Sequence, residues 1–351
     1  MTFDVELFRA LTQAPGPTGF EGPVMRVVRE RLSAVAKPQG DALGNLWARV
    51  GSEGDLEMAV VAHADQIGLI VTYIDEQGFV WFDHIGGIDR QLLPGHAVTI
   101  HAAGSVIDRV VGRKPTHLIP QEDRGKAPEL HEQYIDIGVH DRAAALERVA
   151  VGDPVTFAQR FLELSPGVYA TLACDDRAGV YVACRALEER AAGGGGAALT
   201  AVATVHEETT RMGAKAQKHQ LRADVVVVVD CDFATDQPDV DVKNAGGEIK
   251  LGGGAVVVRG AGSNERLFRR AVEVARREKI PFQIKAVGGR MMTDADELMA
   301  GGAATLSLEI PLRYMHGPFE VVRGDDMEAT VSLIAALTSE LGGSSPDSFR
   351  D

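Results

Sequence analysis

The sequence predicts an α/β fold in three layers, because short apolar runs alternate along the chain with amphipathic helical patterns. Apolar runs of about four to eight residues are typical of strands buried on both faces of a sheet. The clearest runs are Met58–Ala62, Leu199–Val205, Val225–Val229 and Thr305–Ile310. From about residue 68 to 165 strand-like pieces follow one another instead, which indicates a β module inserted into the α/β part.

Helical patterns lie before and between these runs. Between residues 24 and 35, for example, the apolar residues at positions 24, 27, 28, 32 and 35 share one helical face. Residues 41–47 indicate a turn that enters a strand. The helical patterns are Val5–Ala10, Val24–Val35, Ala178–Arg190 and Glu265–Lys279.

The inserted module contains mostly strand patterns, with one helix-like piece at Arg142–Val149. We therefore expect a catalytic domain in two parts, residues 1–67 and 165–351, interrupted by a β domain at residues 68–164. The strand-like pieces are Leu69–Ile74, Phe79–Phe82, Ala97–Ile100 and Val106–Val111.

Composition excludes several classes of protein. The chain has 351 residues, with 36 Lys and Arg against 50 Asp and Glu, so its formal charge of −14 argues against nucleic-acid binding. Cys174, Cys184 and Cys231 show no CxxC spacing, which fits a reducing compartment. We see no signal peptide and no apolar run near the ~20 residues that span a bilayer, so we expect a cytoplasmic protein without a membrane partner.

Histidines and carboxylates follow the predicted strands. In open α/β sheets ligands bind beyond the carboxyl ends of the strands, so these side chains should meet at one edge. A single Asp after a strand is most often a turn or helix-cap residue, but contributions from five segments make coincidence a poor explanation. The residues are His63 and Asp65, Asp175 and Asp176, Glu207 and Glu208, Asp230, and His316.

This set of donors is typical of a hydrolytic metal site. Imidazoles and carboxylates without cysteine ligands suit Zn, Co or Mn, and two such ions ~3.5–4 Å apart need a carboxylate between them. Within the pair Glu207–Glu208, one acid can bind a metal while its neighbour takes a proton from a metal-activated water. The alternative is a purely structural role, in which both glutamates are solvated acids at the start of a helix.

With these residues assembled, the sequence resembles the TET-type metallo-aminopeptidases, the family of glutamyl and deblocking aminopeptidases. Ordered motifs carry the resemblance over nearly the whole chain. They are Pro15-Gly-Pro-Thr-Gly-Phe-Glu21, Asp41-Ala-Leu-Gly-Asn-Leu46, Ala62-His-Ala-Asp-Gln-Ile-Gly68, Val111-Gly-Arg-Lys-Pro-Thr-His-Leu118, Ile135-Asp-Ile-Gly138, Asp175-Asp-Arg-Ala-Gly179, Glu207-Glu208 with Gly213-Ala214, and Pro311-Leu-Arg-Tyr-Met-His316.

The resemblance implies a role for each matching residue. His63 and Asp230 would hold one metal ion, Glu208 and His316 a second, and Asp175 would bridge them. Glu207 would be the general base, and Asp65 would orient the His63 imidazole. It also implies a three-layer zinc-peptidase-like catalytic domain with an inserted small β-barrel or PDZ-like domain. That insertion would mediate self-assembly into dimers or dodecamers, and short peptides would be the substrates.

Three departures from the family pattern leave the preferred N-terminal residue open: Thr209-Thr-Arg-Met212 after the paired glutamates, Gln66, and Leu251-Gly-Gly-Gly-Ala-Val256. Arg211 could favour acidic side chains, although we expect it to be a solvated helix residue. The alternatives to an aminopeptidase are a dimetal deacylase acting on a small molecule and an idle scaffold. A glucanase is disfavoured, because it would need an isolated pair of carboxylates.

Overall fold

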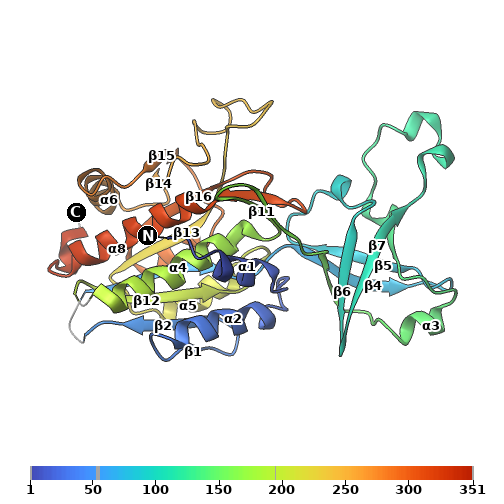
Figure 1. The fold of residues 1–351 in the computed structure, drawn as a ribbon, viewed down its shortest axis with the longest axis horizontal. Helices are drawn as coiled ribbons and strands as arrows, with labels where there is room; N and C mark the ends of the chain where they lie inside the picture. The colour runs from blue at the N-terminus through green and yellow to red at the C-terminus, as the bar shows by residue number, and fades with distance from the viewer. Residues whose placement is uncertain (1, 53–55, 194, 350–351) are drawn as a thin grey trace.

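The computed structural model describes residues 2–52, 56–193 and 195–349. A large α/β part lies beside a smaller part built from strands, which stands at the right of Figure 1. The larger part has helices on both faces of one mixed sheet, and the smaller part contains a closed barrel. The predicted three-layer α/β fold with a small inserted β barrel is thus confirmed.

Eight strands form the large sheet. Its four central strands run parallel, while the neighbouring strands β2 and β14 run antiparallel to them. The register pairs Thr204 with His63, so the chain segments that follow both residues emerge at the same edge. In sheet order the strands are β1 (Gln39–Gly40), β2 (Leu46–Val50), β12 (Ala198–Thr204), β3 (Glu57–His63), β13 (Val225–Phe233), β16 (Ala304–Leu312), β14 (Ala255–Gly260) and β15 (Phe282–Val287).

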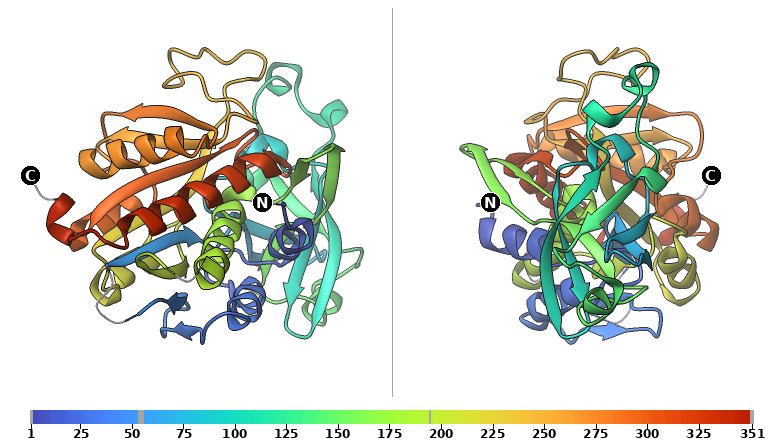
Figure 2. Two further views of the ribbon diagram at one scale, coloured as in Figure 1. Left: turned by 60° about the vertical axis from the view of Figure 1, so that its left-hand side comes forward. Right: turned by 90° about the vertical axis from the view of Figure 1, so that its right-hand side faces the viewer.

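Helices cover the two faces of this sheet unequally (Figure 2). One face packs against α1 (Val5–Gln13), α2 (Gly22–Ser33), α4 (Cys174–Gly193), α6 (Glu265–Arg277) and α8 (Gly324–Leu341). The other face packs against α5 (Met212–Gln220) and α7 (Ala295–Leu298). The sheet is therefore the middle layer of three.

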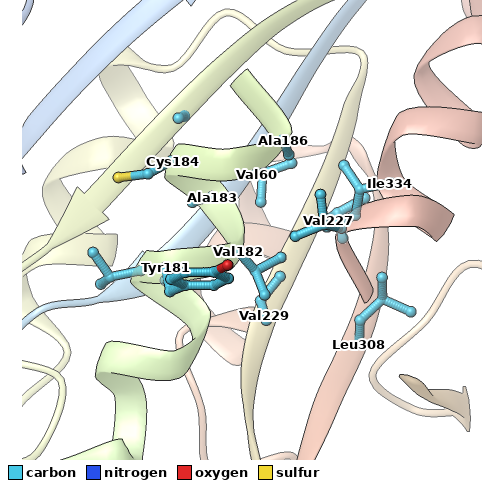
Figure 3. Packing of buried hydrophobic residues seen from close by; sticks show 14 of the residues in the cluster. Val60, Tyr181, Val182, Ala183, Cys184, Ala186, Val227, Val229, Leu308 and Ile334 are labelled. Carbon is cyan, nitrogen blue, oxygen red and sulfur yellow. The ribbon is translucent and has the colours of Figure 1, made fainter. Parts of the chain in front are cut away.

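Alternating valines of β3 and β13 supply both cores, because successive side chains of a strand point to opposite faces. Val60 and Val227 join the cluster beneath α4, whereas Val61 and Val228 join the cluster on the α5 and α7 face. Figure 3 shows Val60, Val227 and Val229 against α4 side chains, with Ile334 of α8 beside them. Burial on both faces explains why these strands are continuous apolar runs.

The smaller part is a closed six-stranded barrel with its own apolar core. Its strands, in order around the barrel, are β4 (Gly68–Ile74), β5 (Val80–Ile85), β8 (Gln133–Asp136), β7 (Ser105–Arg113), β6 (Ala97–Ala102) and β9 (Pro154–Phe157). Helix α3 (Arg142–Leu146) lies within the same stretch of chain. The short 3-10 helices are η1 (Arg90–Leu92), η2 (Thr116–Leu118), η3 (Gln121–Asp123), η4 (Leu130–Glu132), η5 (Met299–Gly301) and η6 (Pro346–Phe349).

A third, three-stranded sheet consists of β10 (Phe161–Ser165), β11 (Val168–Thr171) and β17 (Glu320–Arg323). Its middle strand leads directly into α4, so it fixes the start of that helix. In the ranges described, no helix combines the length and the apolar character needed to cross a bilayer.

Replacing Arg177 with methionine should lower the free energy of unfolding by about 3 kcal/mol or more. Arg177 lies in α4 and is fully buried, and it donates hydrogen bonds to the carbonyls of Leu11 (2.6 Å) and Ala14 (3.0 Å) and to Oε1 of Gln66 (3.1 Å). Burial lowers its pKa to about 10, so the guanidinium stays charged at neutral pH. Methionine would leave these acceptors unpaired.

Urea unfolding measures this loss. Methionine at the exposed Arg26 of α2 is the matched control, and it should change stability by about 0.5 kcal/mol or less. An Arg177→Met protein as stable as the control protein would contradict the structural role of Arg177.

Candidate metal centre

The structure gathers the histidines and carboxylates predicted from the strand ends around one cavity of about 440 Å³. They arrive from the end of β3, from the second half of β13, from the loops after β12 and β16, and from the start of α4. Six of the eight candidates line the cavity, and Asp65 lies behind the His63 imidazole. Asp176 is buried instead at the start of α4, where its Oδ1 accepts a hydrogen bond from the Gly179 amide. The eight are His63, Asp65, Asp175, Asp176, Glu207, Glu208, Asp230 and His316.

Five of these residues form two groups of possible metal donors that share Asp175. In each group the donor atoms all lie within 4.8 Å of one another. The first group is His63, Asp175 and Asp230, and the second is Asp175, Glu208 and His316.

Asp175 divides its two carboxylate oxygens between these groups. Its Oδ1 lies 3.2 Å from Nε2 of His63, and its Oδ2 lies 3.5 Å from Nε2 of His316. The remaining donors also lie within 4 Å of these imidazoles, with Asp230 Oδ1 3.9 Å from His63 Nε2 and Glu208 Oε2 3.3 Å from His316 Nε2. A carboxylate that faces two donor sets is the arrangement a bridging ligand requires.

The electrostatics of the cluster fit divalent cations. Burial, followed by the charges of Asp176 and Asp175, raises the pKa of Asp230 well above its usual range. Burial likewise raises the pKa of Glu208 to about 7, and its Oε1 has no hydrogen-bond partner within the described chain. Buried carboxylates this crowded need cationic charge beside them. The oxygen and imidazole donors are those that Zn, Co or Mn accept.

Asp65 fixes several parts of the site at once. Its Oδ1 lies 3.5 Å from Nδ1 of His63, and its carboxylate accepts hydrogen bonds from the Glu207 and Glu208 amides at 3.0 and 3.1 Å. Thr18 donates a further hydrogen bond at 2.7 Å. Burial would raise the pKa of Asp65, but these partners outweigh burial and lower it. Asp65 therefore stays ionised and holds the His63 ring together with the glutamate loop.

Glu207 lines the cavity but belongs to neither donor group. Its carboxylate pairs with Arg211, whose Nε donates to Oε1 at 3.0 Å. Burial, with the nearby charges of Asp175 and Asp65, raises the pKa of Glu207, while His63 and Arg211 oppose that shift. An acid that lies beside the donor groups without belonging to them can exchange a proton with a water or substrate in the cavity.

The interpretation of Arg211 as a solvated helix residue is wrong. Its side chain is only 16% exposed, and it precedes α5 with a φ of 54°. Besides binding Glu207, the guanidinium donates to the carbonyl of Met292 at 2.8 Å. The long-range contact with Met292 decides the orientation of Arg211, and no local sequence pattern could indicate it.

Glu320 is a further residue of the site that sequence reasoning missed. It is buried in β17 and accepts hydrogen bonds from the amides of Asp175 (3.1 Å) and His316 (2.7 Å). It thereby joins the start of α4 to the loop that carries His316. A lone glutamate in a short strand has no spacing that would reveal this role.

Comparisons with known proteins point in one direction. The family model of the M42 glutamyl aminopeptidases matches residues 44–333. The lysyl aminopeptidase of Pyrococcus furiosus is 33% identical over 346 residues, covering 96% of this chain and 97% of that protein.

Solved structures agree with the sequence comparisons. The TET aminopeptidase from the marine sediment archaeon Thaumarchaeota archaeon SCGC AB-539-E09 superposes with a TM-score of 0.93, at 28% identity and with 98% of each chain covered. The Pyrococcus horikoshii TET1 peptidase, which can assemble into a tetrahedron or a large octahedral shell, gives a TM-score of 0.86 at 30% identity, covering 96% of this chain and 99% of that one. The chain belongs to the M42 glutamyl aminopeptidase family.

Proposed function

We propose that this M42 aminopeptidase uses two divalent metal ions to remove N-terminal residues from short peptides. One ion would be held by His63, Asp230 and Asp175, and the other by Glu208, His316 and Asp175. The observation that carries the proposal is the placement of the two Asp175 oxygens, one against each donor group. Zn is the expected ion, with Co or Mn as alternatives.

The two bound ions would polarise the scissile carbonyl and acidify water. Glu207 then acts as general base, accepting the proton of the attacking water and passing it to the leaving amine. Arg211 holds the Glu207 carboxylate from one side. Asp65 holds the backbone of the Glu207–Glu208 loop and the His63 ring, so the base and the ligands keep their relative positions.

A substrate and metal panel tests this function. Protein stripped with a chelator should be inactive, and adding back Zn, Co or Mn should restore cleavage of aminoacyl anilides. The alternative, a dimetal deacylase, would instead hydrolyse acyl amino acids that lack a free α-amine. Full activity after verified metal removal would contradict the metal mechanism, and activity on acyl amino acids alone would favour the deacylase.

Replacing Arg211 with leucine should lower kcat about 10–100-fold with little change in KM, because the Glu207 carboxylate loses its positioning partner. Lysine at the same position should recover part of the rate, since an ammonium can still pair with Glu207. Steady-state kinetics on one aminoacyl anilide measures both constants. A rise in KM at unchanged kcat would assign Arg211 to substrate binding instead.

We also propose that residues 68–164 form a domain for self-assembly, inserted between catalytic parts at residues 1–67 and 165–351. Support comes from apolar side chains exposed on this stretch, namely Val106 (71% exposed), Leu118 (64%) and Leu146 (53%). The shells formed by the Pyrococcus horikoshii peptidase offer a parallel.

Light scattering should give the mass of a dimer, about twice the 37.4 kDa of one chain, or that of a dodecamer, about twelve times the same mass. If the exposed barrel surface forms the contacts between chains, Val106→Asp should reduce that mass. A wild-type protein that remains monomeric at all concentrations would contradict the assembly proposal.

A further inference from the structure

A second charged cluster opens into the cavity that holds the candidate metal ligands. It combines Asp232 of β13, Glu309 of β16 and Lys285 of β15, and all three residues line that cavity. Lys285 reaches across β14 to contact both acids. None of the three belongs to the donor groups around Asp175.

The cluster sets two buried acidic side chains against one ammonium. Nζ of Lys285 lies 2.5 Å from Oδ1 of Asp232 and 3.4 Å from Oε2 of Glu309, and both acidic side chains are less than 5% exposed. Burial, followed by the charge of Asp232, raises the pKa of Glu309 to about 8, so the formal charge reaches −1 when Glu309 is ionised, a state that an incoming cation favours. Within the described chain, Oδ2 of Asp232 has no hydrogen-bond partner. A buried, unpaired carboxylate oxygen at a cavity wall can accept a hydrogen bond from a ligand that donates one.

The surroundings of the cluster suit a long side chain with an apolar stem. Phe233, Met291, Met292 and Met315 line the same cavity. Methionine side chains adapt to flexible aliphatic chains, and lysine and arginine bury their methylene stems against such surfaces. An apolar wall that leads to an anionic group matches a cationic side chain of this length.

An acidic substrate side chain fits less well. The Lys285 ammonium already contacts two carboxylates, so an incoming carboxylate would lie beside both of them. Arg211 is also committed, to Glu207 and to the carbonyl of Met292. Like charges brought together in a buried site repel strongly, whereas a cation would add a partner for Asp232.

We propose that Asp232 and Glu309, bridged by Lys285, recognise the side chain of an N-terminal lysine or arginine of the substrate. This inference rests on the proposed aminopeptidase function and adds to it the chemical class of the preferred residue. Lys285 contacts both acids and so reduces their mutual repulsion before the substrate arrives.

The test compares lysyl, arginyl, leucyl and glutamyl anilides on the metal-loaded enzyme. Wild type should cleave the two basic substrates at least about tenfold more efficiently, in kcat/KM, than the glutamyl substrate. Asp232→Asn and Glu309→Gln are nearly isosteric changes that each remove an acidic group. Each should lower kcat/KM for the basic substrates about tenfold, while the leucyl value changes less than about threefold. Lys285→Met should retain the preference for basic residues, since it removes a positive charge.

Matched controls come from an exposed ion pair outside the cavity, Lys250 with Glu248. Lys250→Met and Glu248→Gln repeat the same charge changes and should leave all four values unchanged. Inhibition by free L-lysine gives a second readout, and Asp232→Asn should weaken it about tenfold.

A wild-type preference for the glutamyl substrate would overturn the inference. So would equal losses on lysyl and leucyl substrates in Asp232→Asn. In both cases the enzyme still cleaves aminoacyl substrates, so the proposed function stands. If wild type cleaved none of the four substrates with any metal, the proposed function would fail, and this inference with it.

Discussion

Replacing Glu207 with glutamine is expected to lower kcat about 10²–10⁴-fold while the metal content stays at the wild-type value. The amide has nearly the shape of the carboxylate and can still accept the Arg211 hydrogen bond through Oε1. It cannot take a proton from the attacking water. Because Glu207 lies outside both donor groups, its replacement leaves the three side chains proposed for each ion in place.

Two measurements separate the possible roles of Glu207. Elemental analysis counts the ions per chain, and steady-state kinetics gives kcat. Glu265 is an exposed acid of α6, so Glu265→Gln is the matched control and should keep full activity. A Glu207→Gln protein with normal kcat would refute its role as the base, and one that loses metal would show that Glu207 is a ligand.

Replacing Asp175 with asparagine should reduce the metal content from two ions per chain to one or none, and kcat/KM should fall at least about 10³-fold. An amide presents one oxygen and one NH₂ group, so it cannot supply a negatively charged oxygen to each donor group. The local fold should survive, because Glu320 binds the backbone amide of residue 175 and not its side chain.

The matched comparison for Asp175→Asn is Asp65→Asn. Asp65 is also a buried acid that contacts His63, but it belongs to neither donor group. Its loss should weaken metal affinity about 10–100-fold without reducing the number of ions at saturation. Titration of the stripped proteins with Zn, followed by elemental analysis, gives both quantities. Two tightly bound ions in Asp175→Asn would refute the bridging role.

The central sheet could be predicted because its strands are buried on both faces and therefore consist of apolar residues. Val225–Val229 is an uninterrupted run of this kind. Strand β15 was not predicted, since Gln283 and Lys285 interrupt its apolar residues and it lies at the edge of the sheet formed by the described residues, beside β14. The short barrel strand β8 was also missed, because its pairing depends on partners distant in the sequence.

The candidate site was predictable for a related reason. The carboxyl ends of parallel strands lie at one edge, so residues near those ends meet in space, as His63 of β3 and Asp230 of β13 do. The division of the donors into two groups is a property of the three-dimensional arrangement, and the sequence suggested it only through the family resemblance. Contacts such as Arg211 with Met292 and Glu320 with His316 depend on loops, whose paths no periodic pattern describes.

Glu320 has a consequence for how the enzyme would acquire its ions. It positions Asp175 and His316 through their main-chain amides, and Asp65 does the same for Glu207 and Glu208. The ligand-bearing segments are thus anchored by the protein itself, so the folded chain should persist when the ions are withdrawn and should accept replacements without refolding. Which metal occupies the enzyme would then depend on the affinity of the folded donor set for each ion and on the supply of free ions, and not on which ion was present during folding.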